Sequence, residues 1–64
     1  MTGKFLQEKR KEKNLSQEQL ARKCNISISS IRNWEQELRD PNTMSLEIYK
    51  KICFVLNLEK GEGL

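Results

Sequence analysis

The chain has 64 residues, of which 36% are hydrophobic and 33% are charged, and its formal net charge is +3. This balance is typical of a globular protein, and the length allows one domain, residues 1–64, close to the smallest that folds without metals or disulfides. No apolar run is long enough for a membrane span or a signal peptide.

The first predicted helix covers about residues 4–13. Phe5 and Leu6 are its apolar residues. Arg10 follows Leu6 by one helical turn, so we expect both side chains to point toward the core.

The second predicted helix covers about residues 16–24 and has clear start and stop signals. Ser16 is expected to be its N-cap, and Gln19 completes a capping box. Its core-facing stripe consists of Leu20, Ala21 and Cys24. Asn25 ends the helix, because asparagine tolerates the left-handed conformation better than most residues.

The third predicted helix covers about residues 27–36, with Ser27 as its N-cap. Its inward side carries Ile31, Trp34 and Glu35. The opposite side carries mainly hydrogen-bonding groups, namely Ile28, Ser29, Arg32, Asn33 and Gln36. Such a stripe suits the reading of base edges, although on an isolated helix it would more often be an ordinary solvated face. The preceding helix and tight turn make the pair a helix-turn-helix, which favours DNA.

Glu35 is a carboxylate on an inward stripe and therefore needs a partner. Arg10 is the only cation that is similarly placed on the core side of its helix. We therefore predict an ion pair between Arg10 and Glu35.

A loop containing Pro41 and Asn42 precedes the last predicted helix, residues 45–56, which is capped by Ser45 or Thr43. Its expected core face consists of Leu46, Tyr49, Ile52, Cys53 and Leu56. Phe54 lies opposite that face, as a lone surface aromatic or as part of a self-association contact with Val55 and Leu58. The tail, residues 59–64, is expected to fray or to lead into another domain.

The two cysteines, Cys24 and Cys53, lack metal-ligand spacing, and the chain has no histidine. We predict buried, reduced thiols, as in an intracellular, cytoplasmic protein. The carboxylates are scattered rather than convergent, so we expect no catalytic residues, no metal and no cofactor.

The positive charge is concentrated toward the N-terminal side. Residues 1–39 hold nine Lys and Arg against five Asp and Glu, whereas residues 40–64 hold three against four. This distribution favours a polyanionic partner, although a solvated lysine-rich face is common in small domains.

Several short motifs together resemble the Xre/Cro type of phage and bacterial repressors. They are Leu15-Ser16-Gln17, Leu20-Ala21, Ile26-Ser27, Ser30-Ile31 and Trp34-Glu35, and the likeness extends over about residues 5–58. The resemblance implies an all-α, lambda-repressor-like bundle of four to five short helices, whose third helix lies in the major groove. It also implies the pair between Arg10 and Glu35.

By matching position, the resemblance also implies the DNA contacts. Those expected to read bases are Ile28, Ser29, Arg32 and Asn33. Those expected to contact phosphates are Gln17, Ser27, Gln36, Arg39 and Thr43. The implied protein is a transcriptional regulator, most often a repressor, that binds a pseudo-palindromic operator as a homodimer without a small-molecule ligand. The alternative is an antitoxin or a protein-binding helical module whose main ligand is a protein.

Three positions depart from the family pattern. Asn25 replaces the usual glycine of the turn, and Gln36-Glu37 replaces the usual Asn-Gly after the third helix. We expect Glu37 to lengthen that helix, and its charge would weaken DNA binding unless it points away from the phosphates. The loop before Ser45 is about three residues longer than usual, which bears on the contacts of Arg39 and Thr43.

Overall fold

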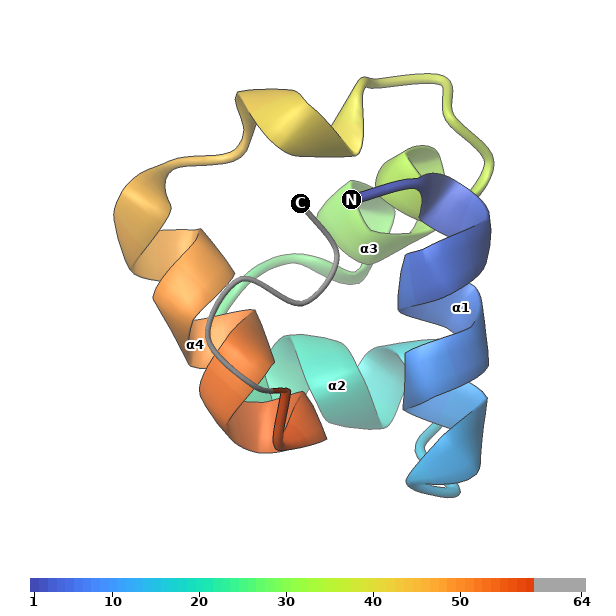
Figure 1. Cartoon of the computed structure of the whole chain (residues 1–64), viewed down its shortest axis with the longest axis vertical. Coiled ribbons are helices and arrows are strands. Elements are labelled where there is room, and N and C mark those ends of the chain that lie inside the picture. Colours follow the sequence, from blue (N-terminus) through green and yellow to red (C-terminus); the bar gives the residue numbers. More distant parts are fainter. Residues whose placement is uncertain (59–64) are drawn as a thin grey trace.

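The computed structural model describes residues 1–58. These form α1 (Gly3–Glu12), α2 (Gln17–Cys24), α3 (Ile28–Glu35), a one-turn 3-10 helix η1 (Pro41–Thr43) and α4 (Leu46–Leu56), with no strand among them. In Figure 1, α1 and α4 stand on opposite sides, with α2 across the bottom and α3 above it. The all-α prediction is confirmed.

Local capping chemistry defines the helix boundaries. Ser16 accepts a hydrogen bond from the Gln19 amide, and the Gln19 side chain bonds back to the Ser16 amide, so the predicted capping box is present. Ser27 and Ser45 are the N-caps of α3 and α4, where their side chains accept from the Ser30 and Ile48 amides. Each cap lies outside its helix, so α2, α3 and α4 begin one residue later than the sequence suggested.

The core lies where α2 packs against α3 and α4, and where α1 packs against α3. Its buried apolar members are Met1, Leu6, Leu20, Ala21, Cys24, Ile31, Trp34, Ile52 and Leu56. Within residues 1–58 two charged side chains are also buried beside this core, those of Arg10 and Glu35. None of the described helices has the length and hydropathy needed to cross a bilayer.

Two expectations about the last helix are wrong. Leu46 is 66% exposed rather than part of the core, because it is the first residue of α4. At this end of the molecule Met1 and Pro41 are buried instead. Cys53 is only half-buried, whereas Cys24 is buried as predicted; both thiols are free. The tail for which fraying was expected lies outside the described residues.

Candidate nucleic-acid interface

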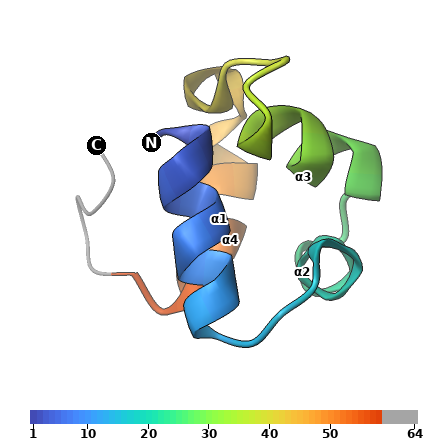
Figure 2. The same ribbon diagram turned by 90° about the vertical axis from the view of Figure 1, so that its right-hand side faces the viewer.

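A tight turn joins α2 to α3. Asn25 adopts the left-handed conformation, with φ of 56°, at the position where the family pattern has glycine. The amide of Ile26 then donates to the Ala21 carbonyl at 3.0 Å, which closes the turn. The small side chain of Ala21, 3% exposed, allows the two helices to approach closely. In Figure 2, α2 is seen almost end-on and α3 lies above it.

The two faces of α3 differ sharply in burial. Ile31 and Trp34 are 0% and 2% exposed, and the Glu35 side chain is also 2% exposed. The outer stripe, by contrast, presents Ser29, Arg32 and Gln36 as exposed residues and Ile28 and Asn33 as half-buried ones. Ile28 packs partly against the core, so only part of its side chain is available to a ligand.

The outer stripe is chemically uncommitted. Within residues 1–58, no side-chain hydrogen bond or ion pair engages Ser29, Arg32 or Asn33. Hydroxyl, guanidinium and carboxamide groups in a row can therefore meet an external ligand without giving up an internal bond, and these groups match the hydrogen-bonding edges of bases.

Arg10 connects three elements at the inner side of this unit. Its Nε lies 2.7 Å from Glu35 Oε2, and its Nη2 donates to Glu35 Oε1 at 3.0 Å. Its Nη1 donates to the Leu15 carbonyl at 2.7 Å. The ion pair expected from the sequence is thus present and fixes the end of α3 to α1, while the third bond ties Arg10 to Leu15 in the loop before α2.

Gln17 joins the same network. Its Nε2 donates to Glu35 Oε1 at 3.1 Å, so one of the two amide protons is used inside the molecule. Ser27 is likewise committed in part, because its hydroxyl accepts from the Ser30 amide at 3.2 Å. Both residues lie at the N-terminal ends of their helices, where free backbone amides favour an anion.

The remaining candidate phosphate contacts follow α3. Gln36 is its exposed C-cap, and Arg39 places its guanidinium 5.8 Å from the centroid of the Trp34 ring. Thr43 lies in η1, where its hydroxyl donates to the Asp40 carbonyl at 2.6 Å. The residue best supplied with unused donors here is therefore Arg39 rather than Thr43.

Glu37 has a role that the sequence did not reveal. It adopts φ of 57°, and α3 ends at Glu35, so the expectation that Glu37 lengthens the helix is wrong. Its carboxylate accepts a hydrogen bond from the Gly3 amide at 3.1 Å, in the first turn of α1. A negative group is favourable at a helix N-terminus. The charge is therefore used to join the end of α3 to the start of α1.

Gly3 permits this close approach. A Cβ atom at this position would lie 2.4 Å from the Trp34 carbonyl oxygen and 2.5 Å from that of Glu35. The sequence did indicate that position 37 is unusual, because Glu37 stands where the family pattern has glycine. It did not identify Gly3 as the partner of Glu37, because the two residues are 34 positions apart.

A family model described as Helix-turn-helix matches residues 6–62. The chain belongs to this Xre/Cro-type helix-turn-helix family, which is a family of DNA-binding transcription regulators. Comparisons with curated proteins and with solved structures gave no match.

Proposed function

We propose that the protein is a repressor that recognises a specific sequence in double-stranded DNA by placing α3 in the major groove. The observation that carries the proposal is the uncommitted outer stripe of α3, which faces solvent while the inner side of the helix is anchored by Trp34 and the Glu35 ion pair. A rigid helix with unused donors and acceptors is what base readout requires.

Each residue of the stripe has a role that fits its chemistry. Asn33 pairs bidentately with adenine, and Arg32 pairs with guanine or with a phosphate. Ser29 bonds to either type of base edge, and the accessible part of Ile28 contacts a thymine methyl group.

The phosphate contacts fix the register of the protein on the duplex rather than the sequence that it reads. Gln17 and Ser27, with the nearby helix N-terminal amides, contact one stretch of backbone. Gln36 and Arg39 contact the backbone beyond the end of α3. Thr43 adds a weaker contact, because its hydroxyl proton is used within η1.

The operator is a pseudo-palindrome bound by a homodimer, because one short helix reads only a few base pairs and dimers of this type place half-sites about 10 base pairs apart. The surface at the end of α4 supports such a contact. Phe54 is 87% exposed, and Val55 and Leu58 are half-buried beside the core.

The test is selection of bound duplexes from a random DNA pool at near-physiological salt. We expect an enriched inverted repeat that binds at least about 10³-fold more tightly than random duplex. An enriched single half-site would support DNA readout but contradict the dimer. No enrichment, with only weak salt-sensitive binding, would contradict the proposal and favour a protein as the main ligand.

A further inference from the structure

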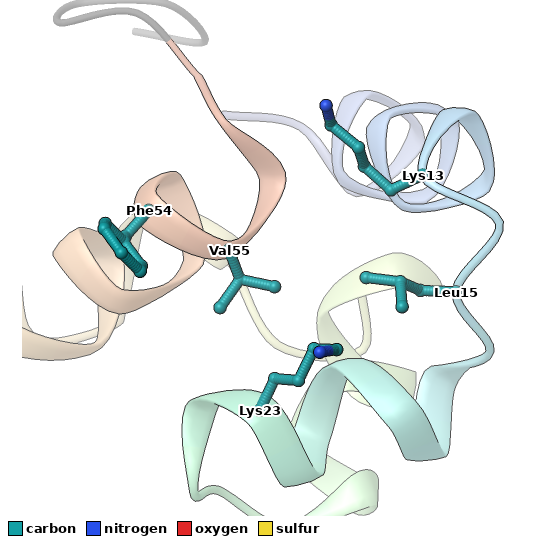
Figure 3. A pocket seen from close by; sticks show the side chains of 5 residues that line it. All are labelled: Lys13, Leu15, Lys23, Phe54 and Val55. Atoms are coloured by element: carbon teal, nitrogen blue, oxygen red, sulfur yellow. The ribbon is translucent and has the colours of Figure 1, made fainter.

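A groove of about 560 Å³ lies between the end of α1, α2 and the end of α4. Its lining residues are Lys13, Leu15, Lys23, Phe54 and Val55. Figure 3 shows Leu15 and Val55 on opposite walls, with Lys13 on one side and Lys23 on the other. No lining residue belongs to α3, so the groove is separate from the stripe proposed to read DNA.

The walls of the groove are apolar. Leu15 and Val55 are half-buried and pack against the core, and Phe54 next to Val55 is 87% exposed. A single exposed aromatic residue needs no explanation, but one that continues an apolar groove marks a surface suited to another apolar group.

The two lysines of the groove carry charge that the described residues leave unneutralised. Neither Lys13 nor Lys23 has an ion-pair partner within residues 1–58. The acidic residues closest to them in the sequence are already paired, Glu12 with Lys9 at 3.7 Å and Glu18 with Arg22 at 2.7 Å. The groove is therefore both apolar and positively charged.

The wall formed by Leu15 is fixed before any ligand arrives. The Leu15 amide donates to the Arg10 carbonyl at 3.2 Å, and the Leu15 carbonyl accepts from Arg10 Nη1 at 2.7 Å. On the other wall, Asn57 ends α4 in the left-handed conformation, and the Leu58 amide donates to the Cys53 carbonyl at 2.9 Å. A preformed groove lowers the entropic cost of binding.

We propose that this groove is the docking site for an acidic, apolar segment of another protein. An aliphatic or aromatic side chain of that segment lies between Leu15 and Val55 and against Phe54. Its Asp or Glu side chains pair with Lys13 and Lys23. The proposal goes beyond DNA binding, since it assigns a second ligand of different chemistry to a different face.

Charge complementarity favours this occupant over a second copy of the chain. A two-fold contact centred on the groove would bring the lysines of both copies into one interface whose lining residues include no carboxylate, and juxtaposed like charges oppose association. The dimer contact proposed above uses Phe54 and Val55 but neither lysine. Because both contacts use Phe54 and Val55, the acidic segment and a second copy of the chain compete for this surface, and substitution of the lysines distinguishes between them.

The test begins with a displayed library of random 15-residue peptides, selected for binding to the 64-residue chain. Enriched peptides are synthesised with a fluorophore, and their affinity is measured by anisotropy. We expect sequences that combine Asp or Glu with large apolar residues. Because the double substitution replaces two attractive charges with two that repel an acidic peptide, Lys13→Glu/Lys23→Glu should weaken binding at least about 10-fold.

A matched control is Lys4→Glu/Lys11→Glu. Its two lysines are exposed on α1 and lie outside the groove, and the change in net charge is the same. We expect this variant to bind within about 2-fold of wild type, and Phe54→Ala to bind at least about 5-fold more weakly because an aromatic anchor is lost. Thermal melts should show all three variants folded, since the substituted side chains are exposed.

Three outcomes would overturn the proposal. The first is a selection that enriches no peptide, and the second is equal weakening by both lysine pairs, which would mean non-specific attraction. The third is peptide-induced NMR shifts that fall on Ser29 and Arg32 rather than on Leu15, Lys23 and Val55. Self-association that Phe54→Ala abolishes and the groove lysine pair does not, without any enriched peptide, would assign this surface to a second copy.

Discussion

Arg10 and Glu35 form a two-pronged ion pair across 25 positions of sequence, with Nε to Oε2 at 2.7 Å and Nη2 to Oε1 at 3.0 Å. The two side chains are 9% and 2% exposed. Paired geometry of this kind fixes the relative orientation of its partners as well as holding them together. It fixes α3, whose outer stripe is the proposed DNA-reading surface, to the rest of the domain.

Arg10→Ala should come close to unfolding the domain. It leaves the Glu35 carboxylate buried without its cation, which costs about 3–5 kcal/mol, comparable with the total stability of so small a core. The free energy of unfolding from urea titration measures the effect. Arg10→Met/Glu35→Leu should be less damaging than the single substitution, because no charge is left unpaired. A wild-type melting curve for Arg10→Ala would contradict the structural role given to the pair.

Substitution of Glu37 separates two opposing effects. Glu37→Ala loses the hydrogen bond to the Gly3 amide but keeps a side chain at φ of 57°, so it should lower stability by about 1 kcal/mol. Glu37→Gly loses the same bond but removes left-handed strain of about 1 kcal/mol, so it should be nearly neutral. Parallel urea titrations of both variants test this. A glycine variant that is as unstable as the alanine variant would mean that the backbone strain is negligible.

The elements with local determinants could be predicted from the sequence. The capping box of Ser16 and Gln19, the caps Ser27 and Ser45, and the left-handed Asn25 depend on residues within a few positions of one another, so their chemistry is visible without the fold. The two faces of α3 follow from helical periodicity alone. The ion pair between Arg10 and Glu35 could also be predicted, because each residue is a charge on an otherwise apolar helix face.

Features set by tertiary context were not predictable. Leu46 satisfies the periodicity of a core face but lies in the first turn of α4, beyond the packed region. From the sequence, Glu37 is only a charged residue at a position where the family pattern has glycine. Its hydrogen bond to Gly3 becomes visible only when the fold brings the start of α1 beside it. The groove that contains Lys13 and Lys23 is formed by the α1–α2 connection, α2 and α4, so no single segment of the sequence predicts it.

Asn33→Ala and Arg39→Ala should weaken DNA binding in different ways. Loss of Asn33 removes a base contact, which costs about 1–3 kcal/mol on the selected operator and relaxes the preference at one base pair. Loss of Arg39 removes a phosphate contact, so it should weaken operator and random duplex alike and reduce the log-log salt slope by about 0.9. Titrations at four salt concentrations resolve both effects. Equal losses on both duplexes for Asn33→Ala would remove it from the reading surface.

Stability should decline at alkaline pH through Cys24. Burial raises the pKa of this thiol, and Lys51 opposes the shift only in part. The folded state therefore retains the proton at a pH where the unfolded state has lost it. Its contribution is complete below about pH 9 and declines as the pH rises further. Unfolding free energies between pH 8 and about 10 should fall more steeply for wild type than for Cys24→Ala. Equal slopes would show that Cys24 does not cause the decline.

The most direct test of DNA reading by α3 compares the selected operator with random duplex for wild type and for Ser29→Ala/Arg32→Ala/Asn33→Ala. The three side chains make no hydrogen bond or ion pair within the described structure. The free energy of unfolding of the variant should therefore lie within about 1 kcal/mol of the wild-type value. We predict that it retains weak, salt-dependent binding to both duplexes and loses most of the preference for the operator. A folded variant that still prefers the operator as strongly as wild type would contradict the central claim.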